Sequence, residues 1–226
     1  MDMINSVRSV LAPPHRAGWP FIGAGLVVVV LGLILAGWLA WLGLIFTVFC
    51  LYFFRDPERV VPPRADAVVA PADGLVVRVD AAVPPPELGL PALAMPRIAI
   101  FLSVLDVHVN RVPMAGIVTR IAYRHGSFVN AADKESDENE RNAIAIRLAN
   151  GTEMAVVQIA GLIARRILCD IHEGDQLVTG ARFGIIRFGS RTDVYLPHGT
   201  VPLVAVGQRA VGGETVLATL APSTVA

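Results

Sequence analysis

A glycine and a serine, Gly189 and Ser190, stand directly before an alternating run of residues, Thr192–Leu196. A serine hydroxyl in a strained turn can attack the carbonyl carbon before it and convert the amide to an ester, and glycine tolerates the backbone angles required. β-Elimination then leaves dehydroalanine, whose hydrolysis gives ammonia and a pyruvoyl group. A Gly-Ser step is common, however, so on these two residues alone a turn entering a strand is the simpler interpretation.

Lysine occurs only once, as Lys134 in an acidic loop, and this scarcity restricts the chemistry. A pyridoxal cofactor needs a lysine in an apolar pocket, and lipoyl or biotinyl carriers need one at a hairpin tip. The five histidines lack the spacings of a metal site, and Cys50 and Cys169 do not make a disulfide or zinc framework. A pyruvoyl ketone would replace a lysine-bound cofactor, because it captures a substrate amine and accepts electrons from a departing carboxylate.

The composition indicates a membrane segment. Of the 226 residues, 54% are hydrophobic and the mean hydropathy is +0.59, which is too apolar for an ordinary soluble domain. The excess lies in residues 17–54, which carry no charge. One span needs about 20 apolar residues, so we expect two short helices split near Ala36–Trp38, with one long tilted helix as the alternative. Gly32, Ala36 and Ala40 would let the helices approach closely.

The remaining residues, 56–226, indicate a mostly β domain of the barrel-sandwich type, so the whole chain is α+β with an N-terminal helical hairpin in residues 1–55. Asn150-Gly151 marks a β-hairpin. Short helices are expected at 104–110 and 132–139. Zero net charge does not favour nucleic-acid binding. The expected strands are 75–79, 97–103, 116–124, 143–148, 153–159, 165–171, 183–188, 192–196, 201–206 and 215–219.

Several stretches after Leu51 together resemble phosphatidylserine decarboxylase, in particular its short bacterial and archaeal form. They are FFRDPER, APADGLVVRV, FLSVLDVHVNRVPMAG, GSFVNAADKESDENERN, QIAGLIARRI, EGDQLVTGARFGIIRFGSRTDVYLP and GGETVLATL, in that order. This family is a pyruvoyl enzyme made as a precursor that cuts itself at Gly-Ser. The resemblance implies a cut between Gly189 and Ser190, a covalent pyruvoyl cofactor derived from Ser190, and decarboxylation of phosphatidylserine to phosphatidylethanolamine and CO₂.

The resemblance also implies roles for side chains. Asp73 matches the family's acid for self-processing, which would orient and charge-stabilise a histidine base; it also fits a simple Asp-Gly turn. His108 matches the first histidine of an H-x-x-H stretch whose second position is Arg111 here, so His108 would serve processing and substrate protonation, or another group is recruited. Arg111 would bind the substrate carboxylate or phosphate. His125 and His198 are reserve candidates for these roles.

The implied substrate, phosphatidylserine, would enter from the cytoplasmic leaflet of the inner membrane, since arginines flank both ends of the apolar run. The large and small fragments of the precursor would stay together, and the resemblance implies a homodimer. Two alternatives remain open. A membrane-anchored serine hydrolase would use Ser190, Asp73 and His108 in an uncut chain, and a non-enzymatic adaptor with a lipoyl-like barrel would tolerate Ser190→Ala.

Overall fold

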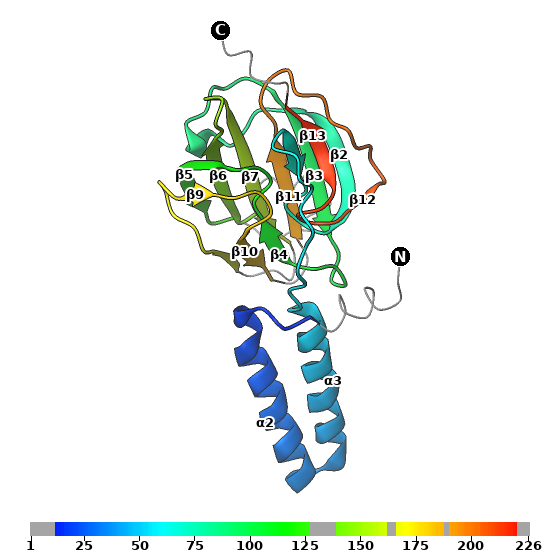
Figure 1. Ribbon diagram of the computed structural model, residues 1–226. Helices are drawn as coiled ribbons and strands as arrows, with labels where there is room; N and C mark the ends of the chain where they lie inside the picture. The colour runs from blue at the N-terminus through cyan, green and yellow to red at the C-terminus, as the bar shows by residue number, and fades with distance from the viewer. Residues whose placement is uncertain (1–11, 127–138, 162–165, 188–189, 221–226) are drawn as a thin grey trace. The chain divides into compact units, whose positions relative to one another are not determined.

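The computed structural model describes residues 12–126, 139–161, 166–187 and 190–220. The chain divides into two compact units, Met1–Glu58 and Arg59–Ala226. The apolar helices belong to the first unit and the strands to the second (Figure 1).

Two antiparallel helices, α2 (Trp19–Leu35) and α3 (Gly37–Phe53), follow a short 3₁₀ turn, η1 (Arg16–Gly18). Ala36 between them is extended, with φ −164° and ψ 119°, so the predicted split into two helices is confirmed. Among the described residues, 16–35 form one helix that is long and apolar enough to span a membrane, with a mean hydropathy of 2.3, whereas α3 is slightly shorter.

Small residues allow α2 and α3 to pack closely. A Cβ atom at Gly25 would overlap the Thr47 side chain, and one at Gly32 would overlap the backbone of Ala40. The predicted close approach at Gly32 and Ala40 is therefore confirmed. Ala36, which was expected at the same interface, lies in the turn instead.

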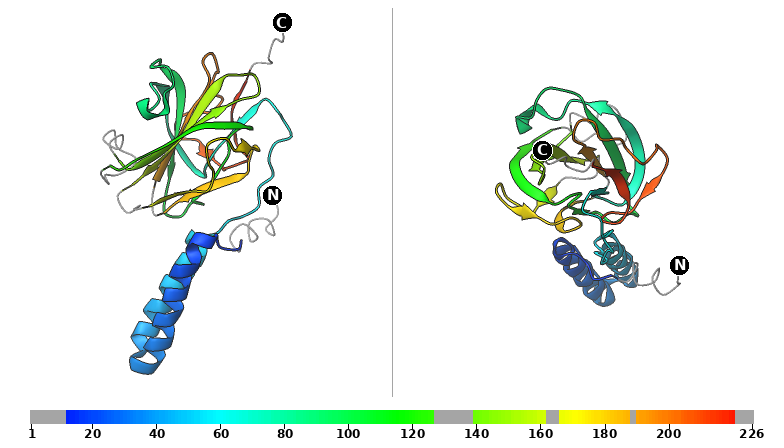
Figure 2. Two further views of the ribbon diagram at one scale, coloured as in Figure 1. Left: turned by 90° about the vertical axis from the view of Figure 1, so that its left-hand side faces the viewer. Right: turned by 45° about the horizontal axis from the view of Figure 1, so that its top comes forward.

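Thirteen short strands lie in the described part of the second unit. They are β1 (Ala67–Val69), β2 (Gly74–Ala82), β3 (Met95–Leu102), β4 (Val109–Arg111), β5 (Gly116–Arg124), β6 (Arg141–Arg147), β7 (Glu153–Ala160), β8 (Ile167–Cys169), β9 (Gln176–Leu177), β10 (Arg182–Ile186), β11 (Ser190–Tyr195), β12 (Arg209–Ala210) and β13 (Val216–Thr219), with one 3₁₀ turn, η2 (Pro86–Leu88). An eight-stranded sheet in the order β12-β2-β3-β11-β7-β6-β5-β9 curls into a half-barrel (Figures 1 and 2). Two smaller sheets, β4-β10-β8 and β1-β13, complete the mostly β fold that the sequence predicts.

The main hydrophobic core lies between the large sheet and the two small ones. It includes Val194 of β11 and Phe183 of β10. Tyr195, the next residue of β11, packs in a second cluster on the opposite face of the large sheet. Successive side chains of a strand point to opposite faces, so Ser190 and Thr192 share the core face with Val194.

The hairpin predicted at Asn150-Gly151 joins β6 to β7 and is confirmed. Gly151 has a φ of 82°, in the left-handed region that glycine favours. The side-chain oxygen of Asn150 accepts a hydrogen bond from the Thr152 amide at 3.0 Å, which satisfies the turn locally.

Two expected elements are wrong. Residues 104–110 form no helix: the Ser103 amide donates to the Asp106 carboxylate at 2.8 Å in a tight turn, and β4 follows. No strand forms at 201–206 in the described chain, where one isolated bridge joins Pro202 to β13. The helix expected at 132–139 lies almost entirely outside the described residues.

Candidate active site

Ser190 is the first residue of β11, the strand flanked by β3 and β7 in the large sheet. It pairs with Leu102 on one side and with Ala160 on the other. Its side chain is 0% exposed, and among the described residues its hydroxyl oxygen has no hydrogen-bond partner. A buried polar group without a partner costs about 1–3 kcal/mol. The preceding residue, Gly189, lies outside the described residues, so the predicted cleavage bond is described only on its serine side.

His108 lies beside the strand that leads to Ser190. The amide of Ile186, at the end of β10, donates to the His108 carbonyl at 3.3 Å, and residues 187–189 alone separate β10 from β11. The ring is fully buried, and its Nδ1 lies 2.9 Å from the carbonyl oxygen of Asp106. If Nδ1 donates this hydrogen bond, Nε2 is the nitrogen that can take up a proton.

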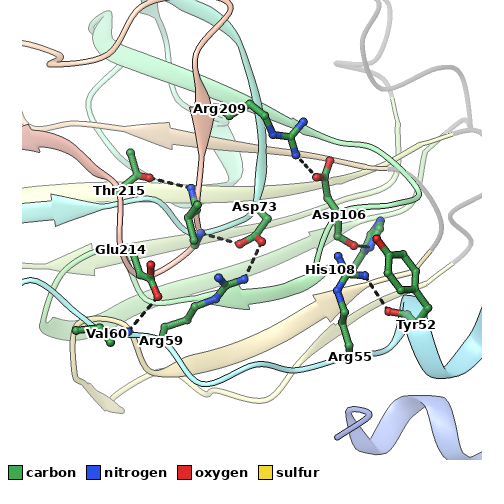
Figure 3. A network of polar contacts seen from close by, with 12 residues as sticks. Tyr52, Arg55, Arg59, Val60, Asp73, Asp106, His108, Arg209, Glu214 and Thr215 are labelled. Atoms are coloured by element: carbon green, nitrogen blue, oxygen red, sulfur yellow. Dashed lines mark hydrogen bonds and ion pairs between the residues drawn. The ribbon is translucent and has the colours of Figure 1, made fainter. Parts of the chain in front are cut away.

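Asp106 is held in place from two sides. Its carboxylate accepts the Ser103 amide at 2.8 Å and pairs with Arg209 of β12 (Figure 3). The loop that carries His108 is thereby attached to the edge of the large sheet.

Asp73 lies in the loop before β2. Oδ2 accepts a hydrogen bond from Arg59 at 2.7 Å and Oδ1 accepts one from the Gly212 amide at 2.8 Å (Figure 3). Burial raises the pKa of the Asp73 carboxyl, and Arg59 and the Gly212 amide oppose that rise. Asp73 thus bonds Arg59 and the Gly212 amide, whereas Nδ1 of His108 lies against the Asp106 carbonyl. The predicted orienting role of Asp73 therefore stays a prediction.

Arg111, at the end of β4, is 5% exposed and donates from Nη1 to the Gly180 carbonyl at 2.9 Å. A Cβ atom at Gly213 would lie 3.0 Å from Cδ of Arg111 and 3.5 Å from Cβ of Arg59. Both arginines therefore border one Gly-Gly turn, next to Asp73. Guanidinium groups so placed suit a carboxylate or a phosphate.

The two reserve histidines lie away from Ser190. His198 follows the other end of β11, which lies about 17 Å from Ser190 at roughly 3.3 Å per residue, and it lines a cavity of about 470 Å³. His125 follows β5, which lies three strands from β11 in the sheet order. Its exposed ring packs edge-on against Tyr123, with the two ring centroids 4.9 Å apart. Lys134 lies outside the described residues.

The outer face of β11 carries a buried ionic network. Arg191 donates from Nε and Nη2 to the two oxygens of Asp193 at 2.8 and 3.0 Å. Arg97 of β3 lies 3.6 Å from the same carboxylate and forms two hydrogen bonds with Asp80 of β2. The hydrogen bonds between Arg97 and Asp80 raise the pKa of the arginine and lower that of the aspartate. The network thus connects three adjacent strands.

Sequence reasoning missed three buried amide side chains near Ser190. Asn142 donates to Gln158 at 2.9 Å, and Gln158 donates to Asn110 at 2.7 Å. Gln158 stands directly opposite Thr192 in the β7–β11 pairing. The available signal was an isolated amide inside an otherwise apolar strand, as in the sequence AVVQIA, because burying an amide is costly unless it is hydrogen-bonded.

A family model described as phosphatidylserine decarboxylase matches residues 46–218. The phosphatidylserine decarboxylase proenzyme of Granulibacter bethesdensis is 64% identical over 223 residues, covering 98% of this chain and 91% of the relative. The proenzymes of Cereibacter sphaeroides and Gluconobacter oxydans are 54% and 56% identical, and cover 96% and 97% of this chain and 94% and 100% of their own lengths. These matches favour a decarboxylase over the hydrolase and adaptor alternatives. With its mostly β fold, the chain belongs to the phosphatidylserine decarboxylase family and is a decarboxylase.

Proposed function

We propose that this chain is a precursor that cleaves itself between Gly189 and Ser190, and that the product decarboxylates phosphatidylserine to phosphatidylethanolamine. The relatives described above are named proenzymes. One observation carries the proposal: the Ser190 hydroxyl is wholly buried at the start of a central strand and has no hydrogen-bond partner among the described residues. A hydroxyl that serves neither a cap nor a turn is available to attack the peptide carbonyl before it.

The cofactor would occupy the position of Ser190, at the first residue of the small fragment. A pyruvoyl group supplies an electrophilic ketone that captures the substrate amine and accepts the electron pair released with CO₂. The position fits such a group, because a pyruvoyl group is no larger than serine. The flanking strands β3 and β7 exclude bulk water there, which strengthens electrostatic interactions.

His108 is the proposed base that takes the serine proton and the later proton donor to the substrate carbon. Its contact with the Asp106 carbonyl supports this role, because an Nδ1–H that donates there would leave Nε2 for the proton exchange. Asp73 supplies negative charge that favours the protonated imidazole, and Arg59 helps to keep Asp73 ionised despite its burial.

Substrate binding is proposed at Arg111 and Arg59, which border the Gly-Gly turn and would pair with the lipid carboxylate or phosphate. The apolar hairpin would hold the enzyme in the inner membrane with both helix ends in the cytoplasm, in keeping with Arg16 and Arg55 at its two ends. The headgroup would then be processed without leaving the membrane surface.

Intact-mass measurement of the purified full-length protein in detergent tests the proposal. Two species are expected, residues 1–189 and 190–226, the smaller one lighter by one ammonia than a fragment with a free amino-terminal serine. Ser190→Ala should give a single uncut chain that releases no CO₂ from phosphatidylserine in mixed micelles. Thr152→Ala removes a hydroxyl from an exposed hairpin turn and should be cut and active. A continuous wild-type chain that is fully active would rule the proposal out.

A further inference from the structure

The three buried amides form a relay that crosses the core from β6 to β4. Nδ2 of Asn142 donates to Oε1 of Gln158, and Nε2 of Gln158 donates to Oδ1 of Asn110. Asn142 is 2% exposed and the other two are 0% exposed. Because the carbonyl oxygens of Gln158 and Asn110 both accept from the amide before them, the relay ends in the Nδ2 group of Asn110, which can only donate.

A glycine makes room for this relay. Asn110 of β4 is paired with Gly184 of β10. A Cβ atom at Gly184 would lie 3.3 Å from Nε2 of Gln158 and would overlap the backbone oxygen of Leu168. Any side chain at this position would displace either the Gln158 amide or strand β8. The absence of a side chain there lets Gln158 reach Asn110 at 2.7 Å.

Buried polar atoms that lack partners gather where the relay ends. Among the described residues they include Nδ2 of Asn110, Oγ of Ser190 and Oγ1 of Thr192. Gln158, which bonds Asn110, faces Thr192 directly and Ser190 diagonally across the β7–β11 pairing. Each such atom costs about 1–3 kcal/mol when buried alone. Three of them at neighbouring positions of one core indicate a site that a ligand completes.

We infer that the Asn110 amide is a catalytic hydrogen-bond donor that binds an anionic oxygen beside Ser190, and that Gln158 and Asn142 are positioning residues for it. This inference rests on the proposed function. A fixed neutral donor in a dry core stabilises negative charge strongly, because it needs no reorganisation when the charge appears. The anionic oxygen has two sources, the oxyanion formed during self-cleavage and the carboxylate of the substrate.

In the cleavage reaction, Oγ of Ser190 bonds to the carbonyl carbon of residue 189 and gives its proton to the base, proposed as His108. The π electron pair of that carbonyl moves to its oxygen, which becomes the anion that Asn110 binds. When the pair returns, the carbon–nitrogen bond breaks, the nitrogen takes the proton and an ester remains. The donor therefore lowers the barrier at the step where the anion exists.

The test compares full-length Asn110→Leu and Gln158→Met precursors with wild type. The first removes the donor at nearly constant shape, and the second leaves the Asn110 amide in place without its fixed orientation. Removing one oxyanion donor is expected to slow cleavage about 10²–10³-fold, followed as the conversion of one gel band into two. Gln158→Met should slow it less. Gln208→Met makes the same chemical change in an exposed turn and should leave cleavage unchanged.

The two sources of the anion give different results. Slow cleavage in a variant with the wild-type circular dichroism spectrum assigns Asn110 to the processing oxyanion. Normal cleavage followed by a raised KM for phosphatidylserine assigns it to the substrate carboxylate. If Asn110→Leu does not fold, Gln158→Met carries the same comparison. A folded variant with wild-type cleavage and wild-type kcat/KM overturns the inference, whereas a wild-type chain that is never cut overturns the proposed function instead.

Discussion

Replacing Asp193 by leucine removes the carboxylate at the centre of the ionic network on β11. Arg191 and Asp193 are 0% and 1% exposed, so water cannot solvate the guanidinium group when its two hydrogen bonds to Asp193 are lost. Breaking a buried pair from one side costs about 3–5 kcal/mol. Arg191→Met should fall at the lower end of that range, because Asp193 keeps Arg97 at 3.6 Å.

Urea unfolding of the full-length protein in detergent measures these costs. The variants are made in the Ser190→Ala background, because a chain cut before that residue would not unfold and refold as one molecule. The double variant Arg191→Met/Asp193→Leu replaces both charges by apolar side chains and should recover much of the loss. The four chains form a double-mutant cycle that isolates the coupling energy of the pair.

The exposed pair formed by Arg64 and Asp66 supplies the control, since its side chains are 51% and 45% exposed. Asp66→Leu should leave the unfolding midpoint almost unchanged, because water and salt screen such a pair. If Asp193→Leu also costs less than about 1 kcal/mol, the value typical of surface pairs, then the outer face of β11 is solvated and the reasoning fails.

Two further perturbations test the helical hairpin and Asp73, and the first has a matched control. Gly32→Leu should separate the hairpin helices and lower the melting temperature in detergent, because its Cβ would overlap the Ala40 backbone, whereas Gly23→Leu, with no atom within 4 Å of its Cβ, should not. Arg59→Gln removes the charge that opposes the burial-raised pKa of Asp73, so the carboxylate is protonated at higher pH. The pH below which cleavage slows should therefore be higher in this variant than in wild type. If that pH is unchanged, the ionisation of Asp73 plays no part in cleavage.

Local patterns predicted most of the elements, and pairing over long sequence distances explains the failures. The apolar run of residues 17–54 predicts two helices, and the shorter apolar run after the Asn150-Gly151 turn predicts strand β7. The helix predicted at residues 104–110 is wrong because part of this segment forms β4. That strand has only three residues and exists through its pairing with β10, far along the chain. A strand defined by a distant partner leaves no periodic signal of its own.

The candidate site likewise combines residues that local motifs indicate with contacts that only the folded chain reveals. Ser190, Asp73 and His108 could be proposed from sequence because short motifs carry them, and their roles stay predictions. The bond between Asn110 and Gln158 joins residues 48 positions apart, and Gly184 permits it from a third strand. Sequence shows that each of these residues is polar or small at an apolar position, but not that they meet.

The two faces of β11 explain why Ser190, the proposed nucleophile, stands beside a fully buried arginine. Shifting the pairing of a strand by one residue exchanges its two faces. Such a slip would drive Arg191 and Asp193 into the apolar core and turn Ser190 outward. The ionic network with Arg97 therefore makes the register costly to lose, and a correct register keeps the serine facing the amides. If cleavage leaves Ser190 at a chain end, the same network holds that end in the sheet.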